Sequence, residues 1–107
     1  MEKIVERTLM YDFYGDLLTP RQREIYESVV LEDYSLSEVA DDQGVSRQSV
    51  HDMIRRCDHL LDGYEERLHL VEKFLQIREK ISRIRTLARE RDMEDIVRIC
   101  NEISGEL

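Results

Sequence analysis

A stretch in the middle of the chain, residues 46–56, is rich in side chains that suit contact with nucleic acid. If its apolar residues point inward, an advance of about 100 degrees per residue turns the others outward. The outward set is Gln48, Asp52, Arg55 and His59, flanked by Ser49, His51 and Arg56. Gln48 suits adenine and an arginine suits guanine or phosphate, whereas Asp52 does not suit phosphate. A face that is only solvated, or that contacts a protein, is the alternative.

Local signals predict two short helices joined by a tight turn around this face. Ser35 can cap the first helix, with Glu38 as the reciprocal carboxylate of a capping box. Gly44 can adopt the left-handed conformation that ends a short helix, and Ser46 can cap the next one. The second helix would then pack through Val50, Met53, Ile54 and Cys57. With the small Ala40 at the crossing, the pattern predicts a helix-turn-helix over residues 35–56, rather than a plain antiparallel pair of helices.

Further helices are expected on both sides of this motif. An apolar stripe predicts a helix from about residue 2 to 16, and Thr19, Pro20 and Gln22 form a strong start signal for a second helix that ends near residue 32. Beyond Arg47 the apolar spacing of three and four residues has no clear stop. One long helix and two helices with a bend near His69 both fit, and we favour the bend.

The last part of the chain predicts another helix and a possible interface. Asp92 is expected to cap a final helix. Before it runs a second apolar register that predicts dimerisation, formed by Leu70, Phe74, Ile77, Ile81, Ile84 and Ala88. A basic strip flanks that register, formed by Arg78, Lys80, Arg83, Arg85, Arg89 and Arg91. The register could instead pack on the protein's own first and last helices, and the strip could instead bind RNA or phosphate.

These elements predict an all-α protein of about six helices. We expect a helical domain over residues 1–62, which contains the helix-turn-helix, and a C-terminal helical extension over residues 63–107 that mediates dimerisation. No apolar run approaches the roughly 18 residues that span a bilayer, and residues 1–7 lack the hydrophobic stretch of a signal peptide. We therefore expect a cytoplasmic protein that does not enter membranes.

Charge argues against strong non-specific binding to nucleic acid. The 107 residues carry a formal net charge of −8, and affinity for phosphates comes mainly from Lys and Arg. The segment with the helix-turn-helix, residues 35–62, is itself acidic, whereas residues 78–91 are basic. DNA binding by the isolated protein should be weak or strongly salt-dependent, or should need a partner that supplies positive charge.

The remaining reactive residues predict no enzyme and no cofactor. Cys57 and Cys100 lie far apart on apolar helix faces, so we expect buried thiols, and no metal-ligand spacing is present. Adjacent acidic residues, such as Asp41 with Asp42, do not converge on one helix face as acid–base carboxylates should. The sequence also lacks a Gly-rich phosphate loop, a nucleophile elbow and a paired-His metal motif.

Two stretches resemble region 4 of bacterial sigma factors, the part that reads the promoter −35 element. They are Leu18-Thr-Pro-Arg-Gln-Arg-Glu and Ser35-Leu-Ser-Glu-Val-Ala-Asp-Asp-Gln-Gly-Val-Ser-Arg-Gln-Ser-Val. The resemblance implies nucleic-acid-binding positions at Ser46, Arg47, Gln48, Ser49, His51, Asp52, Arg55 and Arg56. A sigma-type recognition helix is normally more basic, whereas this one includes Asp52 and Asp58.

The chain as a whole resembles the YlxM family of small bacterial proteins, encoded beside genes of the signal recognition particle pathway. The resemblance rests also on Tyr11-Asp-Phe-Tyr-Gly-Asp-Leu-Leu-Thr and Tyr64-Glu-Glu-Arg-Leu-His-Leu-Val-Glu-Lys-Phe. It implies an all-helical protein with a DNA-binding helix-turn-helix and a role in, or regulation of, that pathway. The leading hypothesis is a dimeric regulatory protein that binds DNA. The alternative is an accessory protein that binds the RNA or the GTPase of the signal recognition particle instead.

Overall fold

The computed structural model describes residues 2–107 and is built from α-helices, with no strand in that range. The six α-helices are α1 (Lys3–Tyr14), α2 (Pro20–Tyr26), α3 (Leu36–Gln43), α4 (Arg47–Leu68), α5 (Leu70–Glu90) and α6 (Glu94–Glu106). A 3₁₀ turn, Gly15–Leu17, follows α1, and a π-helical turn, Glu27–Leu31, extends α2. The predicted all-α fold of about six helices is confirmed. None of the helices in the described range combines the length and apolar character needed to cross a membrane.

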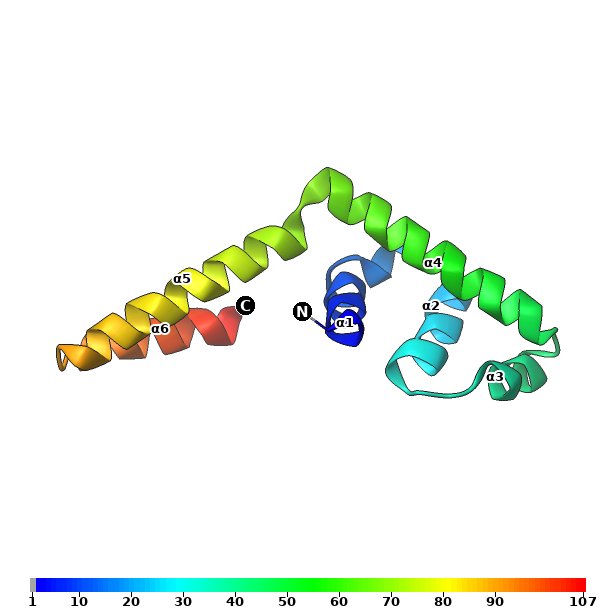
Figure 1. The fold of residues 1–107 in the computed structure, drawn as a ribbon, viewed down its shortest axis with the longest axis horizontal. Helices are drawn as coiled ribbons and strands as arrows, with labels where there is room; N and C mark the ends of the chain where they lie inside the picture. Colours follow the sequence, from blue (N-terminus) through cyan, green and yellow to red (C-terminus); the bar gives the residue numbers. More distant parts are fainter. Residues whose placement is uncertain (1) are drawn as a thin grey trace. The chain divides into compact units, whose positions relative to one another are not determined.

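The chain forms two compact units. The N-terminal unit comprises the described residues up to His69, and the hairpin unit comprises Leu70–Leu107. In the N-terminal unit, α1, α2 and α3 all pack on α4, and Figure 1 shows them along one side of that long helix. In the hairpin unit, α5 and α6 pack side by side (Figure 1). The two units are therefore a small multi-helix core and a two-helix hairpin.

The predicted start of α2 is confirmed, and the helical run ends near residue 32 as predicted, although its last turn is π-helical. Gln22 N–H donates to Thr19 Oγ1 at 3.2 Å, and the Gln22 side chain accepts from Thr19 N–H at 2.9 Å, which completes a capping box. The α-helix gives way at Glu27 to the π-helical turn, and Asp33 then adopts a positive φ of 60°. Aspartate tolerates this conformation better than most residues.

The structure interrupts the helix at His69, so two helices form rather than one long one. His69 has a φ of 55°, and its backbone N–H donates to Glu65 O at 2.8 Å. The favoured interpretation, two helices separated near His69, is thereby confirmed. Gly63 lies inside α4 without breaking it, as a single glycine in a helix can.

The expectation that Asp92 caps the last helix is wrong. Asp92 has a φ of 53° and belongs to the turn that ends α5, while the N-cap position of α6 is Met93, whose side chain makes no capping hydrogen bond. Met93 N–H donates back to Ala88 O at 2.8 Å, which satisfies a carbonyl at the end of α5. The chain thus uses Asp92 as a left-handed helix stop, because aspartate can adopt that conformation.

Candidate nucleic-acid interface

The turn between α3 and α4 has the geometry that its sequence predicts. Ser35 and Glu38 form the reciprocal capping box, with Glu38 N–H donating to Ser35 Oγ at 3.0 Å and Ser35 N–H donating to the Glu38 carboxylate at 3.2 Å. Gly44 is left-handed, with φ 67° and ψ 33°, and Val45 N–H donates to Ala40 O at 3.1 Å. Ser46 Oγ accepts from Ser49 N–H at 3.1 Å and so caps α4. The predicted helix-turn-helix is confirmed.

Burial fixes the orientation of α4. Its inward face consists of Val50, Ile54, Cys57 and Leu61, which are buried among the other helices of the N-terminal unit. All eight predicted binding residues are exposed on the remaining surface: Ser46, Arg47, Gln48, Ser49, His51, Asp52, Arg55 and Arg56. The eight are thus accessible to solvent around the first half of α4, the part of a recognition helix that contacts base edges.

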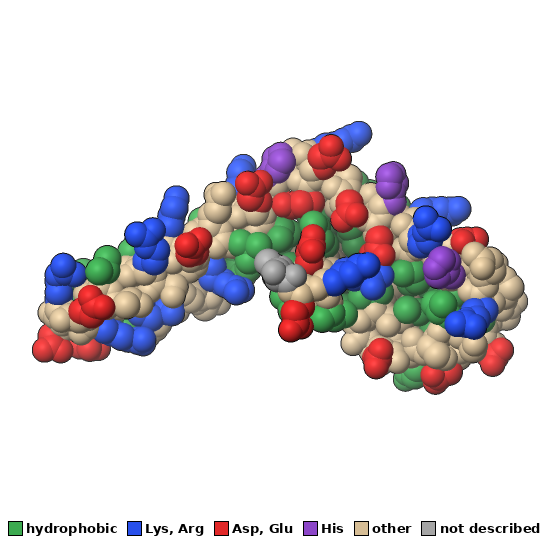
Figure 2. All heavy atoms as spheres, in the orientation of Figure 1, with side chains coloured by type: hydrophobic (Ala, Val, Ile, Leu, Met, Phe, Trp, Pro, Cys, Tyr) green, Lys and Arg blue, Asp and Glu red, His purple; other side chains and the backbone are tan. Residues whose placement is uncertain are grey.

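Three cations on this surface have no anionic partner within the part of the chain that the structure describes. No carboxylate of residues 2–107 lies within 4.0 Å of a side-chain nitrogen of Arg47, Arg55 or Arg56. On the face in view, Figure 2 shows acidic and basic side chains interspersed over the N-terminal unit. The three guanidinium groups can therefore bind an external anion without first breaking an ion pair.

Asp52 is occupied by its neighbours on α4. Gln48 Nε2 donates to Asp52 Oδ1 at 2.9 Å, and His51 Nδ1 lies 3.8 Å from the same oxygen. Gln48 and Asp52 are one turn apart, and side chains at this spacing meet on a helix. The Gln48 amide is thus held along the helix, and it must leave Asp52 before both of its polar atoms can face a base. A shallow hollow beside it is lined by Leu36, Arg47, Gln48 and His51.

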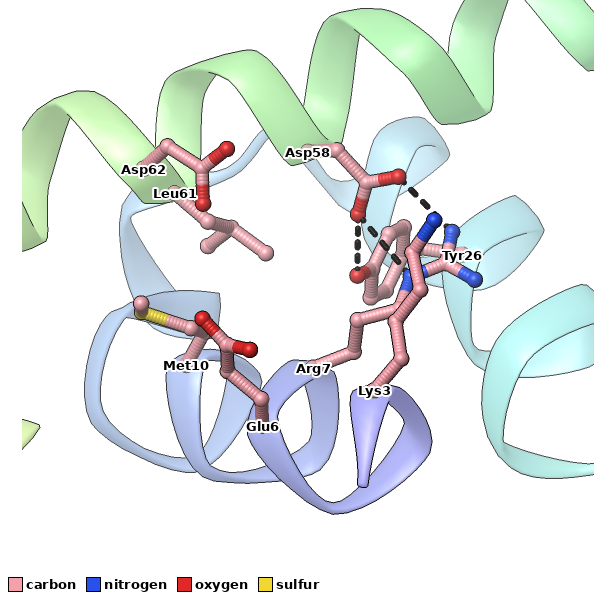
Figure 3. A pocket seen from close by; sticks show the side chains of 8 residues that line it. All are labelled: Lys3, Glu6, Arg7, Met10, Tyr26, Asp58, Leu61 and Asp62. Atoms are coloured by element: carbon pink, nitrogen blue, oxygen red, sulfur yellow. Dashed lines mark hydrogen bonds and ion pairs between the residues drawn. The ribbon is translucent and has the colours of Figure 1, made fainter. Parts of the chain in front are cut away.

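A polar cluster behind α4, which sequence reasoning missed, ties this helix to α1 and α2. Arg7 makes two contacts with Asp58, from Nε to Oδ1 at 3.2 Å and from Nη2 to Oδ2 at 2.7 Å. Tyr26 O–H donates to Asp58 Oδ1 at 2.6 Å, and the Arg7 guanidinium lies 5.7 Å from the centre of the Tyr26 ring. Figure 3 shows the three side chains meeting at one edge of a hollow of about 230 Å³. Asp58 is therefore a support for α4 rather than part of its outward face.

The protonation states in this cluster follow from burial and from Asp58. Burial, reinforced by the hydrogen bond to Asp58, raises the pKa of Tyr26 above its usual range, so the phenol stays neutral. Burial tends to lower the pKa of Arg7, but the hydrogen bond and charge of Asp58 outweigh it and raise the pKa overall. Burial and the nearby Asp58 charge raise the pKa of the Cys57 thiol to about 11. Near pH 7 the Tyr26 phenol is thus a neutral donor beside the Arg7 cation.

Aromatic side chains complete the support from α1. The rings of Tyr11 and Tyr26 stack with centroids 5.5 Å apart, and Tyr11 O–H donates to Glu27 in the π-helical turn. Tyr14, which is 1% exposed, donates its hydroxyl to Glu65 Oε1 at 2.5 Å. A Cβ at Gly15 would lie 2.9 Å from the Tyr11 ring, so glycine permits this packing. α1 therefore braces the second half of α4, through contacts at Asp58 and Glu65.

The hairpin unit divides the predicted dimerisation register. Ile81 and Ala88 are buried, at 6% and 3% exposure, Phe74 is half-buried, and Leu70, Ile77 and Ile84 are exposed. Since α5 packs on α6, part of this register is used inside the hairpin. In the basic strip, Arg78, Lys80, Arg83, Arg89 and Arg91 are exposed and Arg85 is half-buried. The register lies on α5, as does the strip except for Arg91, which follows the helix. Part of the register is buried, whereas most of the strip faces solvent.

Comparison with known proteins agrees with this geometry. A family model described as "Putative helix-turn-helix protein, YlxM / p13 like" matches residues 1–99. The UPF0122 protein of Thermoanaerobacter sp. (strain X514) is 42% identical over 104 residues, covering 94% of this chain and 89% of the relative. UPF0122 proteins of Anoxybacillus flavithermus and Geobacillus kaustophilus are 42% identical over 95 residues and 45% identical over 85 residues. These alignments cover 89% and 79% of this chain, and 86% and 77% of the respective relatives.

Proposed function

We propose that this chain, which belongs to the YlxM/p13-like helix-turn-helix family, is a regulatory protein that binds DNA through the outward face of α4. The observation that carries the proposal is the set of three arginines, Arg47, Arg55 and Arg56, exposed without a carboxylate partner in the described chain. They share a surface with amide, hydroxyl and imidazole groups. Such a mixture can hold phosphates and contact base edges at the same time.

In this proposal the first half of α4 enters the major groove. Ser46 caps its N-terminus, the positive end of the helix dipole, which favours a phosphate nearby. Gln48 turns from Asp52 to an adenine, and Asp52 then accepts from the amino group of a cytosine, a pairing that suits an aspartate. The acidic net charge keeps non-specific affinity low, so recognition depends on these base contacts. Contacts of the three arginines with phosphates make the binding fall as salt rises.

Arg55→Ala tests the proposal. Genomic DNA fragments are first enriched on the tagged protein and sequenced, and affinity for the enriched duplex is then measured by fluorescence anisotropy. We expect the binding free energy to weaken by about 1–3 kcal/mol. The slope of log affinity against log salt concentration should fall by about one, the amount for one phosphate contact. Arg67→Ala is the matched control, because Arg67 is exposed near the far end of the same helix.

Unchanged affinity in both Arg55→Ala and Gln48→Ala would contradict DNA recognition by α4. Such a result, with the signal recognition particle recovered from the same cytosol, would favour the second candidate, an accessory protein that binds its RNA or its GTPase. The acidic helix-turn-helix segment, with Asp52 on the outward face, is the observation that supports this candidate.

We also propose that the active form is a homodimer held by the hairpin unit. Ile77 and Ile84 on α5, and Ile99 and Ile103 on α6, are 39–49% exposed. In an antiparallel pair the helical spacing puts these four on the same flank of the hairpin. α5 has six basic and three acidic residues, a net charge of +3, whereas α6 has one basic and four acidic, a net charge of −3. A two-fold axis that sets α5 against the partner's α6 buries the apolar flank and pairs opposite charges.

Ile84→Asp tests the dimer, because Ile84 is exposed and its replacement leaves the α5–α6 contact intact. We expect analytical ultracentrifugation to show a dissociation constant raised at least about tenfold, as a charge at a buried apolar contact requires. Thr86→Asp adds the same charge to α5 away from the apolar flank and should keep the dimer. A wild-type protein that sediments as a monomer at high concentration would refute the proposal.

A further inference from the structure

A hollow of about 530 Å³ lies on the hairpin unit, on the side of α5 away from the exposed isoleucines. Its lining combines three arginines with two serines and one acidic residue: Arg78, Arg83, Arg85, Ser82, Ser104 and Glu79, together with the apolar Leu75. On the face in view, Figure 2 shows Lys and Arg side chains along the hairpin. The DNA-binding proposal for α4 makes no use of these residues.

The arginines of this hollow have no anionic partner in the chain. Within residues 2–107, no carboxylate lies within 4.0 Å of a side-chain nitrogen of Arg78, Arg83 or Arg85. Glu79 is one turn before Arg83 and yet forms no such pair with it. Three cations and one anion leave the hollow with a formal charge of +2. A multiply charged anion would complement it better than a neutral ligand.

Arg85 is positioned by the fold but is not satisfied by it. Its Nη2 donates to Ser104 Oγ on α6 at 2.8 Å, while its Nε is buried and has no acceptor among the described residues. A buried charged donor without an acceptor is unfavourable, so a ligand oxygen that accepted a hydrogen bond from this Nε after a small side-chain rotation would stabilise it. Ser104, which accepts from Arg85, keeps its own hydroxyl hydrogen to donate.

Arg78 is also held in place before any ligand arrives. Its guanidinium lies 5.6 Å from the centre of the Phe74 ring, a contact that restrains a long side chain without using its N–H donors. Guanidinium groups bind phosphate oxygens through two parallel hydrogen bonds, and serine hydroxyls add neutral donors. A carboxylate ligand would offer two oxygens, whereas a phosphate offers three or four to this ring of donors.

We propose that this hollow between α5 and α6 is a binding site for a phosphate group, held by Arg78, Arg83 and Arg85 with Ser82 and Ser104. The phosphate belongs either to a free phosphate or phosphomonoester, or to the phosphodiester backbone of a nucleic-acid strand. The site lies in the hairpin unit, so it neither requires nor excludes DNA recognition by α4.

Calorimetric titration of the full chain with inorganic phosphate at low salt tests the site. We expect the paired change Arg78→Gln and Arg83→Gln to weaken phosphate binding at least about tenfold, because two charge-assisted contacts are lost. Arg89→Gln with Arg91→Gln removes the same charge from the same basic strip outside the hollow and should change binding less than about twofold. Glu79→Gln should tighten binding, because it removes the one repulsive group.

The outcomes separate a built site from general attraction to positive charge. Equal losses in the two arginine pairs, or no phosphate binding by the wild type up to about 50 mM, which corresponds to under ~2 kcal/mol, would overturn the proposal. Thermal melting of each variant checks the fold, and the gain expected for Glu79→Gln cannot arise from unfolding. A short single-stranded RNA that displaces phosphate would identify the backbone as the source, and its failure to displace would identify the free group.

Discussion

The N-terminal unit and the hairpin unit differ in what fills their interiors. Tyr14 and Tyr26 are at most 1% exposed in the N-terminal unit, and each hydroxyl donates to a carboxylate on α4. The buried side chains of the hairpin unit are small or aliphatic: Val71, Ile81, Ala88, Val97 and Cys100. The hairpin unit is also shorter than the ~40 residues below which a chain rarely folds alone.

This difference implies different roles for the two units. Large aromatic residues with directed hydroxyls hold α4 in one orientation, which a recognition surface requires. A two-helix hairpin with an exposed apolar flank gains stability when another surface covers that flank. On the proposals above, the N-terminal unit holds the recognition helix in a fixed orientation. The hairpin unit gains stability when a second copy covers its apolar flank.

The largest expected effect comes from removing an aromatic anchor of the N-terminal unit. Tyr26→Ala should lower the free energy of unfolding by about 4 kcal/mol, because it empties a fully buried site and also strips a donor from Asp58. Urea unfolding followed by circular dichroism measures the loss. Tyr34→Ala is the control, because Tyr34 is 48% exposed, and it should cost less than about 0.5 kcal/mol.

Tyr26→Phe separates the ring from its hydroxyl. This change should lower the free energy of unfolding by only about 1–1.5 kcal/mol, because Arg7 still pairs with Asp58 when the phenol O–H is gone. If Tyr26→Ala and Tyr26→Phe lowered stability equally, the ring would contribute nothing and the contrast between the two interiors would be wrong.

A smaller but more direct comparison uses the two cysteines, since each unit buries one of them. Cys57 lies in the N-terminal unit and Cys100 in the hairpin unit, and both thiols are buried. Reaction with iodoacetamide requires local opening, and with its pKa raised to about 11 the native Cys57 thiol is a poor nucleophile. In dilute protein we expect Cys100 to react about 100-fold faster than Cys57, since the hairpin opens more readily.

Peptide mass spectrometry over time measures both rates in one sample. Raising the protein concentration should slow Cys100 alone, because association covers the hairpin and leaves the core of the N-terminal unit unchanged. Identical rates for the two thiols at every concentration would show that the two units open together as one cooperative structure.

What the sequence could predict depends on how local each signal is. The capping box of Ser35 and Glu38 and the left-handed Gly44 lie within a few residues of the turns that they set, so they could be identified in advance. Asp58 could not, because its partners Arg7 and Tyr26 are 51 and 32 residues away. The only sequence signal for this role of Asp58 was its position next to Cys57, which lies on the inward face of the helix. The prediction that Asp92 caps the last helix was wrong for another reason, since aspartate occurs both as an N-cap and as a left-handed residue that ends a helix.

The sequence could predict which residues form the candidate binding face, but it could not predict the contacts among their side chains. Helical spacing was sufficient to put Gln48 and Arg55 outward, and burial of the opposite face agrees. That Gln48 donates to Asp52, and that Arg55 has no carboxylate partner in the described chain, depends on side-chain conformations that spacing does not determine. The division of the 70–88 register likewise depended on where α6 packs, because burial of Ile81 and Ala88 and exposure of Ile77 and Ile84 follow from that contact.

The smallest expected effect concerns acidic crowding in the N-terminal unit, where Asp62 lines the hollow shown in Figure 3. Partial burial, and then the charges of Asp58 and Glu6, raise the pKa of Asp62 above its ordinary value. A raised pKa means that ionised Asp62 is disfavoured in the folded state, so Asp62→Asn should slightly raise the melting temperature near pH 7. The advantage should shrink as the pH falls through the raised pKa, and vanish below about pH 4, where the unfolded carboxyl is also protonated. Asp12→Asn, on the exposed side of α1, is the matched control. A melting temperature for Asp62→Asn that exceeds the wild type equally at pH 3 and pH 7 would trace the gain to packing rather than to charge.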